Sequence, residues 1–293
     1  MEGPLVEQQS EALASSELAL LVLAIHGTLA ARVLRFLAQP AELFNALFST
    51  QCSLPVASLF DSATPKLATH YAGTHLPMAR STQDEARARF DGSQPILVTA
   101  AQQSDGRGRN DRTWWSAPRP LAASVAFTPQ WSVSAWPRVS LVAGLAIREV
   151  IGNVDLKWPN DIIINGVKVG GILAEADQVG VVVGLGLNLW WPDPPPGVGA
   201  ISTSDPGAER PVALAEEWAT ALLGRMNADE DEWGRDEYLQ ACVTVGQEIS
   251  WDGGTGTAIG VGADGGLVVS TGRGDIVLSS GEVQSVRPTT LTS

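Results

Sequence analysis

The side chains best suited to chemistry lie in the loop at 103–116, which reads QSDGRGRNDRTWWS and follows an apolar run at 96–101. It contains two glycines and three arginines: Gly106, Gly108, Arg107, Arg109 and Arg112. Glycine lets the backbone turn tightly and approach a ligand, and arginine donates in a fork that matches phosphate or carboxylate. We therefore expect an anion-binding loop, although a solvated basic loop has the same composition.

A second candidate is Lys157-Trp158-Pro159-Asn160-Asp161, at the end of a predicted strand. A lysine at a strand exit is a point cation directed into a cleft. The four residues after it are turn formers or can bond local backbone groups, which holds the strand exit rigid. An ordinary corner between two strands gives the same pattern.

Two glycine-containing segments follow, Lys168–Glu175 (KVGGILAE) and Gly184–Asn188 (GLGLN). Glycine in a strand removes a side chain where a ligand or another strand comes close. The sequence pattern alone favours a packing role for Gly171. Asn188 stands at a strand end, where it either reads the edge of a base or caps a turn.

The elements that must position these segments alternate between helix and strand. Apolar periodicity predicts helices at 82–90, 139–151 and 212–226, and strands at 96–101, 124–127, 154–158 and 179–187. Ser81 or Thr82 can cap the first helix. Asn165-Gly166 between two apolar runs predicts a hairpin with a type I′ turn.

The two ends of the chain differ from this central part. Apolar residues recur at helical spacing in the order Leu18, Val22, Ile25, Leu29, Val33 and Leu37, until Pro40. A second short helix is possible at 43–48, and 57–69 has the composition of a linker. After Val245, short β segments alternate with glycine-rich turns, which suits a small barrel of SH3-like size.

These patterns predict an α+β fold: a mixed central sheet with helices on one face, plus a small C-terminal SH3-like β-barrel. The expected divisions are a helical extension and linker of unknown role at 1–70, a catalytic domain at 71–243 and the C-terminal domain at 244–293. With 44% hydrophobic residues, the 293-residue chain can bury a full core.

Composition excludes several classes of function. A net charge of −13 with only 19 basic residues argues against a nucleic-acid partner, so any anionic ligand needs a local basic cluster. The run Leu18–Ile25 is too short to span a membrane, and the charges before it are all acidic, unlike a secretory signal. Two distant cysteines, Cys52 and Cys242, suit a reducing compartment. A cytoplasmic protein without a membrane partner is expected.

Taken in their order along the chain, the arginine loop, the Lys157–Asp161 segment and the two glycine-containing segments resemble the biotin protein ligase family. The resemblance runs from about Leu76 to Pro288. The matching pieces are Ser81-Thr82-Gln83, Gln103, Gly106–Trp114, Lys157–Asp161, Gly171–Leu173, Gly184–Asn188 and Gly281–Arg287. Two residues depart from the family pattern: Gln83 replaces the usual Asn, and Asp111 stands where Gly is usual. The second places a carboxylate among phosphate-binding arginines.

The resemblance implies a class II synthetase-like core and two half-reactions. Biotin carboxylate attacks the α-phosphate of ATP to give biotinyl-AMP and pyrophosphate, and a lysine of a biotin carboxyl-carrier protein then attacks the mixed anhydride. Mg²⁺ would accompany ATP, with no ligand cluster for it in the sequence. Lys157 would be the cation shared by carboxylate and α-phosphate, with Arg107 and Arg109 as further catalytic residues.

The resemblance also implies two sets of binding residues. Biotin would contact Ser81, Thr82, Gln83, Gln103, Arg107, Gly108, Arg109, Lys157 and Gly171. ATP would contact Arg109, Arg112, Trp114, Lys157 and Asn188, and Trp114 would close over the ligand as an apolar lid.

Three alternatives stay open. A lipoate protein ligase runs parallel chemistry on a related fold, although the arginine loop fits the biotin enzymes better. A biotin-sensing repressor needs a basic DNA-binding domain, whereas residues 1–70 carry only Arg32, Arg35 and Lys66 as basic residues. A pseudoenzyme that only binds biotin is conceivable because of Asp111. The sequence leaves open the acceptor protein, the oligomeric state and the role of the extension.

Overall fold

A seven-stranded mixed sheet forms the centre of the described part of the chain. The computed structural model describes residues 70–114, 117–279 and 287–288; the helices predicted at 18–37 and 43–48 and the linker at 57–69 lie outside them. The strands are β1 (Ala72–Leu76), β2 (Ile96–Ala100), β3 (Arg119–Phe127), β4 (Asp155–Lys157), β5 (Asp161–Ile164), β6 (Val167–Ala176) and β7 (Val181–Trp190). Their order is β1-β2-β3-β7-β6-β5-β4. Of the described pairs, β1 with β2 is parallel and the others are antiparallel.

The hairpin between β5 and β6 forms where the Asn-Gly pair predicts it. Asn165 has φ 51° and Gly166 φ 78°, and positive φ at both central residues defines a type I′ turn. Ile164 pairs with Val167 across this turn. At the other end of β5, Asp161 pairs with Gly171 of β6 on one side and with Lys157 of β4 on the other.

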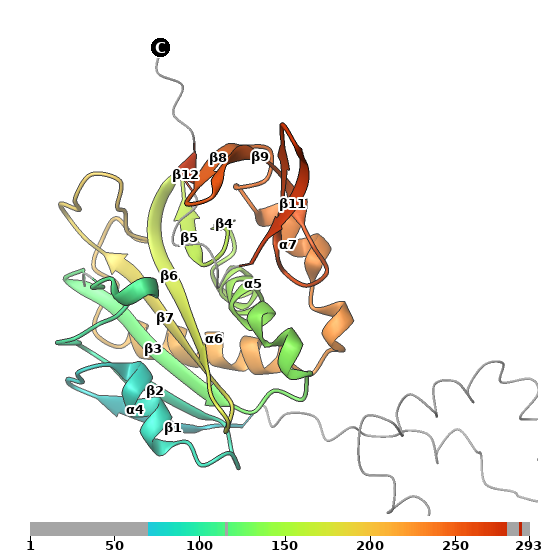
Figure 1. Cartoon of the computed structure of the whole chain (residues 1–293). Helices are drawn as coiled ribbons and strands as arrows, with labels where there is room; N and C mark the ends of the chain where they lie inside the picture. Colours follow the sequence, from blue (N-terminus) through green and yellow to red (C-terminus); the bar gives the residue numbers. More distant parts are fainter. Residues whose placement is uncertain (1–69, 115–116, 280–286, 289–293) are drawn as a thin grey trace, which may run out of the picture. The chain divides into compact units, whose positions relative to one another are not determined.

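Two long helices cover one face of the large sheet, as predicted (Figure 1). They are α5 (Val139–Ile151) and α6 (Arg210–Arg225). Their buried side chains join the main core, and the indole N–H of Trp218 donates to the carbonyl of Ala143 at 3.2 Å. That bond pairs the one polar atom of the fully buried Trp218 side chain, which would otherwise be costly.

The prediction of helices on one face was incomplete, because α4 (Thr82–Arg89) packs on the opposite face. Ala86 of α4 contacts a small apolar cluster with Val98, Ala126 and Val182. Residues next to these three along the strands, such as Leu97, Val125 and Val183, belong to the main core on the other face. Successive side chains of a strand point to opposite faces of the sheet. The helix reads TQDEARAR and buries one apolar residue, so it gives little amphipathic signal for a face.

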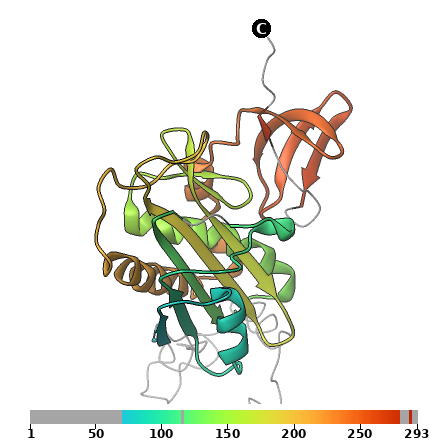
Figure 2. The same ribbon diagram turned by 90° about the vertical axis from the view of Figure 1, so that its left-hand side faces the viewer.

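The C-terminal part forms a second, five-stranded antiparallel sheet, drawn in orange and red in Figure 2. Its strands are β8 (Glu248–Trp251), β9 (Gly254–Val261), β10 (Leu267–Thr271), β11 (Gly274–Leu278) and β12 (Arg287–Pro288), in the order β11-β10-β9-β8-β12. Its buried residues, Ile249, Ala258 and Val261 among them, belong to the same core cluster as α5 and α6. The two sheets therefore share one continuous apolar core.

The remaining helices are short. α7 (Arg235–Ala241) precedes the second sheet, and the 3-10 helices are η2 (Arg109–Asp111), η3 (Val133–Arg138) and η4 (Glu230–Glu232). No helix among the described residues is both long enough and apolar enough to cross a membrane.

Candidate active site

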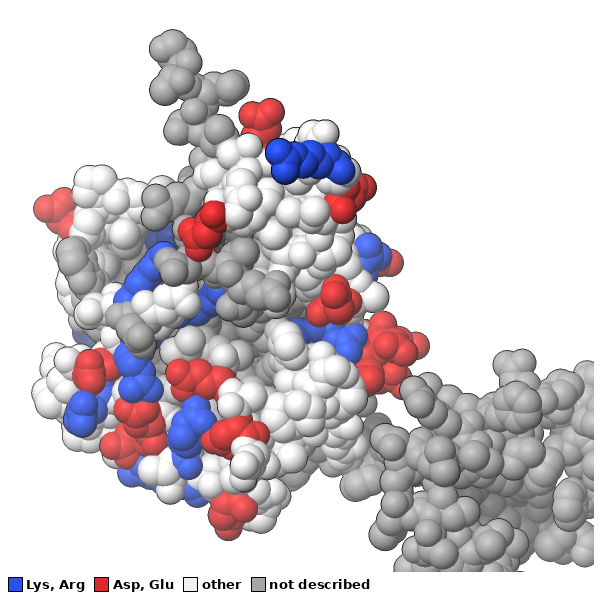
Figure 3. Space-filling view, viewed as in Figure 1, with Lys and Arg blue, Asp and Glu red and all other residues white. Residues whose placement is uncertain are grey.

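A cleft of about 270 Å³ opens on the face of the large sheet that α4 partly covers. It is lined by every predicted site residue except Asn188: Ser81, Thr82, Gln83, Gln103, Arg107, Gly108, Arg109, Arg112, Trp114, Lys157 and Gly171. Figure 3 shows basic side chains inside a hollow in the middle of this face. Its size is close to the lower end of small-molecule sites, which begin at about 300 Å³.

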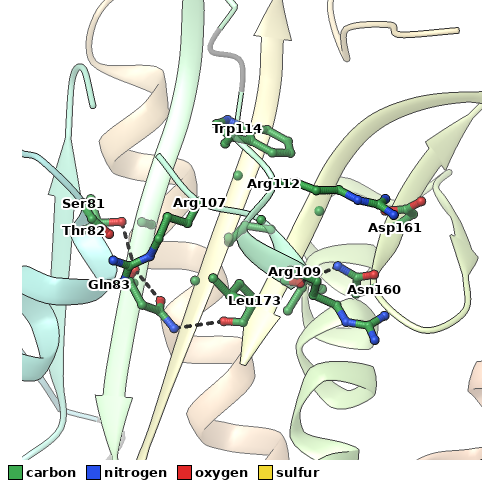
Figure 4. A pocket seen from close by; sticks show the side chains of 18 of the residues that line it. Ser81, Thr82, Gln83, Arg107, Arg109, Arg112, Trp114, Asn160, Asp161 and Leu173 are labelled. Atoms are coloured by element: carbon green, nitrogen blue, oxygen red, sulfur yellow. Dashed lines mark hydrogen bonds between the residues drawn. The ribbon is translucent and has the colours of Figure 1, made fainter. Parts of the chain in front are cut away.

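The arginine loop folds as a small hairpin over this cleft. Arg107 and Thr113 form an isolated antiparallel β-bridge. On either side of it, the Trp114 N–H donates to the Gly106 carbonyl at 2.8 Å, and the Gly108 N–H donates to the Arg112 carbonyl at 2.7 Å. The tip is η2, where Asn110 has φ 56°. Asparagine is among the few residues other than glycine that adopt this conformation readily. The loop thereby directs its three arginines to different sides of the cleft (Figure 4).

The arginines differ in their electrostatic surroundings. Arg107 forms an ion pair with Asp84 of α4 at 2.5 Å, which raises the pKa of its guanidinium. Burial lowers the pKa of Arg109, and the positive charge of Arg112 adds to this while Asp161 opposes it. Arg109 and Arg112 are neighbouring cations, and Arg109 is partly desolvated. An anion bound between them would offset both their mutual repulsion and the desolvation of Arg109.

Two lysines complete the basic lining. Lys168 forms an ion pair with Asp161, whereas the Lys157 ammonium has no hydrogen-bond or ion-pair partner within the part of the chain that the structure describes. Lys168 was not predicted, although its place in the KVGGILAE segment was a signal. Among the described lining residues there are five cations and one carboxylate, Asp161. This is the local basic cluster that the net charge of −13 requires for an anionic ligand.

The residue after Lys157 anchors the corner to the C-terminal part of the chain. Trp158 is 1% exposed. Its backbone N–H donates to the Thr244 hydroxyl at 3.0 Å, and its indole N–H donates to the carbonyl of Gly265 at 3.0 Å. The Val243 N–H donates to the carbonyl of Leu156 at 2.9 Å. Lys157 thus sits between two residues that are held by segments about a hundred positions further along the chain.

Asn160 and the glycines shape the floor of the cleft. Asn160 is joined to Ile172 twice, because its side-chain amide donates to the Ile172 carbonyl at 2.8 Å and its own carbonyl accepts from the Ile172 N–H at 2.9 Å. A Cβ on Gly186 would lie 2.8 Å from the Trp114 ring, but one on Gly171 would lie 3.5 Å from it. Gly186 is therefore required for the ring to lie on β7, and Gly171 is not.

Trp114 lies on these glycines, inside the cleft. Its indole nitrogen is buried and has no hydrogen-bond partner among the described residues. A buried unpaired donor costs roughly 1 to 3 kcal/mol. The role predicted for Trp114, to close over a ligand, stays a prediction.

The opposite wall of the cleft is polar and buried. Ser81, Thr82 and Gln83 stand at the start of α4 and are each less than 5% exposed. The Gln103 carboxamide oxygen accepts from the Thr82 N–H at 2.7 Å, and the Thr82 hydroxyl lies 2.9 Å from that of Ser124. Ser124 was not predicted as a site residue, because a lone serine in the strand LAASVAF gives no signal of a site.

Comparison with known proteins identifies the family. Residues 77–188 match the Biotin/lipoate A/B protein ligase family. A biotin--[acetyl-CoA-carboxylase] ligase of Paracoccus denitrificans is 31% identical over 236 residues, which are 69% of this chain and 96% of the relative. The chain belongs to this family. The Mycobacterium tuberculosis enzyme of the same name is 30% identical, over 66% of this chain and 79% of its own length.

A solved structure shares the fold. It is a biotin protein ligase from Aquifex aeolicus in complex with biotin and ATP, with a TM-score of 0.65 and 24% identity, and the match covers 75% of this chain and all of that one. The seven-stranded sheet with its helices is therefore the biotin ligase type of core.

Asn188 is the one predicted site residue that does not line the described cleft. It is 3% exposed, and its amide donates to the carbonyl of Gly199 at 3.0 Å, which ties the end of β7 to the following loop. Its Oδ1 is buried without a hydrogen-bond partner among the described residues. The ATP contact expected of Asn188 stays a prediction.

The described residues contain no group of three acidic, histidine or cysteine side chains that could hold a metal ion. The carboxylates nearest the cations, Asp84 and Asp161, are each in an ion pair.

Proposed function

We propose that the chain activates biotin with ATP to biotinyl-5′-AMP and transfers the biotin to a lysine of a biotin carboxyl-carrier protein. The observation that carries this is the Lys157 ammonium, which lacks a hydrogen-bond or ion-pair partner among the described residues and lines the same cleft as the arginine loop and the polar wall. The names of the relatives from Paracoccus denitrificans and Mycobacterium tuberculosis support the same reaction.

The first half-reaction brings two anions together, the biotin carboxylate and the triphosphate of ATP. Lys157 neutralises the carboxylate and the α-phosphate, and Arg109 and Arg112 hold the phosphates. The charge of these groups is already fixed in place, so little reorganisation is needed when charge shifts from the carboxylate oxygen to the leaving pyrophosphate. No side chain is needed as a covalent nucleophile.

The uncharged end of biotin is a cyclic urea, and its polar atoms need partners when buried. Among the described residues, the Gln103 Nε2 and the Ser81 hydroxyl at the start of α4 have no hydrogen-bond partner. Together with Thr82 they supply donors and acceptors at the inner wall. Trp114 covers the ligand and keeps water from the mixed anhydride.

We propose that ATP enters as its magnesium complex. In the second half-reaction, the neutral amine of the acceptor lysine attacks the carbonyl of the mixed anhydride, AMP leaves, and the proton lost by the amine passes to the departing phosphate.

Biotin-dependent exchange of pyrophosphate into ATP tests this function. Lys157→Met keeps the length of the side chain and removes the charge, and we expect exchange to fall by about a hundredfold or more in a folded protein. Arg210→Met is the control, because Arg210 is paired with Glu217 on α6 and does not line the cleft. Absence of exchange in the wild type would indicate a biotin-binding pseudoenzyme, and exchange with lipoate alone would indicate a lipoate ligase.

We further propose the division into an extension at 1–70, a catalytic domain at 71–243 and a C-terminal domain at 244–293. The described cleft residues begin at Ser81. Deletion of residues 1–68 is therefore expected to leave the exchange activity intact. Insolubility of the truncated chain would contradict this, and a salt-sensitive complex of the full chain with duplex DNA would support the repressor alternative.

We also propose that β8 to β12 curl into an SH3-like barrel. The register shift between Val268 and Val269 supports this, because a bulge bends a strand and allows a small sheet to close. Barrel closure predicts slow amide exchange along both edges of β11, and fast exchange on its outer edge would contradict it.

A further inference from the structure

Lys168 is turned into the cleft by an irregularity in β6. In a regular strand it would share a face with Gly170 and Ile172, and Ile172 belongs to the main core. The register between β5 and β6 shifts at Ile162 and Ile163, so that β6 has one extra residue at this point. The extra residue moves Lys168 to the opposite face, where it lines the cleft. Bulges redirect side chains in this way next to functional sites.

The ammonium of Lys168 is held by the carboxylate of Asp161 on the neighbouring strand. It lies 3.7 Å from the position that a Cβ on Gly171 would occupy, so the side chain is folded back along β6. The two partners remain partly solvated, with side chains that are 40% and 22% exposed. Ion pairs in contact with water contribute little to stability. An anion with several charges can therefore displace the carboxylate from the lysine.

Asp161 occupies a place that suits a ligand anion. Among the described residues that line the cleft, it is the single carboxylate beside five cations. Its charge acts on Arg109 as well as on Lys168, and it favours the charged form of Arg109 that burial disfavours. The carboxylate thus offsets positive charge that the phosphates of a bound nucleotide would offset in its place.

The register of the strands shows which part of an extended ligand would reach Lys168. Through β7, Ser124 of the polar wall is level with Leu173 of β6. Through β5, Lys157 is level with Gly171 of β6. Lys168 comes before Gly171 in β6, so it lies beyond Lys157 from the polar wall, roughly 15 Å along the strand from Leu173. A ligand with its uncharged end at the wall and its carboxylate at Lys157 would direct the attached phosphates towards Lys168.

We propose that Lys168 is a phosphate-binding residue, whose ammonium passes from Asp161 to the β- and γ-phosphates when ATP enters. The inference rests on the proposed function. When the biotin carboxylate attacks the α-phosphate, the bond from that phosphorus to the bridging oxygen breaks, and its electron pair stays on the departing pyrophosphate. Lys168 neutralises this developing charge, while Lys157 remains with the carboxylate and the α-phosphate.

Two substitutions with opposite expected effects on the KM for ATP test the proposal. Lys168→Met keeps the length of the side chain and removes the charge, so the KM in pyrophosphate exchange should rise by about tenfold or more. Asp161→Asn removes the competing carboxylate, so the KM should fall several-fold. If the ion pair served stability alone, the two substitutions would act in the same direction. An unchanged KM in Lys168→Met, or one that does not fall in Asp161→Asn, would overturn the inference.

The second half-reaction separates the role of Lys168 from that of Lys157. Biotinyl-AMP prepared beforehand carries the α-phosphate but neither the β- nor the γ-phosphate. Transfer of biotin from it to a purified biotin carboxyl-carrier protein should keep the wild-type rate in Lys168→Met and slow in Lys157→Met. Equal slowing in both variants would contradict a specific role of Lys168 at the leaving phosphates. Arg210→Met is the control in both assays, because Arg210 is paired with Glu217 and does not line the cleft.

Two polar substitutions keep the test decisive if the methionine variant does not fold. Lys168→Arg and Lys168→Gln both retain a group that can donate to Asp161, but only arginine retains the charge. The arginine variant should keep a KM for ATP near that of the wild type, and the glutamine variant should show the increase. Equal KM values in these two variants would also overturn the role of Lys168.

Failure of the inference differs from failure of the proposed function. A wild-type chain without biotin-dependent exchange of pyrophosphate would overturn the function itself. A wild-type chain that exchanges, together with a folded Lys168→Met variant of the same KM for ATP, would overturn the role of Lys168 alone.

Discussion

Thr244→Val tests whether the C-terminal segment holds the Lys157 corner. Valine has the shape of threonine without the hydroxyl, so the packing at this 4% exposed position is retained. The Trp158 N–H, which now donates to Thr244 at 3.0 Å, loses its acceptor and stays buried. Such a donor costs roughly 1 to 3 kcal/mol.

That cost is measurable in two ways. A domain of about 200 residues shifts in Tm by about 2 to 4 °C per kcal/mol, so the midpoint should fall by about 2 to 12 °C. If the corner moves by about 1 Å, pyrophosphate exchange should fall by up to about a hundredfold. Because Lys157 is adjacent to Trp158, the loss should appear in kcat as well as in KM.

Two further variants make the result interpretable. Thr244→Ser keeps the hydroxyl and should restore both quantities. Thr220→Val removes an exposed hydroxyl that bonds within α6, from Thr220 to the Glu216 carbonyl at 2.9 Å, and should change neither. A Thr244→Val protein that melts lower but exchanges at the wild-type rate would refute the idea that this bond positions Lys157.

Two other substitutions probe the ligand side of the cleft. Gly186→Ala places a methyl group 2.8 Å from the Trp114 ring, so we expect the ring to be displaced and the KM for biotin to rise several-fold, with a smaller effect from Gly171→Ala, where the nearest ring atom is 3.5 Å away. Asp111→Gly is expected to lower the KM for ATP several-fold, less so at high salt, because it removes a negative charge from the arginine loop. Weaker ATP binding by this variant would instead support an ion pair between Asp111 and Arg112.

The elements predicted well are those whose signal is local. The helix at 139–151 has the predicted bounds, and it ends at Gly152, which has φ 92°. The Asn165-Gly166 turn specifies its own geometry. Strand β3 begins five residues earlier than predicted, at Arg119, because Pro120 masks the strand pattern where the register shifts.

What could not be predicted depends on contacts between distant segments. β1 has a mixed, largely exposed sequence and is a strand because β2 lies beside it. α7 buries only Tyr238 and Ala241, too few for a periodic signal. In the cleft, the motif residues could be predicted by type, but the hydrogen bonds of Ser124 with Thr82 and Gln83 could not, since they depend on the proximity of α4 and β3.

The bond between Trp158 and Gly265 has a consequence for how the enzyme is made. These residues are 107 positions apart, and a ribosome adding about 5 to 20 residues per second needs roughly 5 to 20 s to cover that interval. During this time the arginine loop and the cleft wall have already left the exit tunnel, but the lysine corner lacks its support. The floor of the cleft, on β6 and β7, is made next, and the lysine corner is expected to become rigid only when the polypeptide is nearly finished.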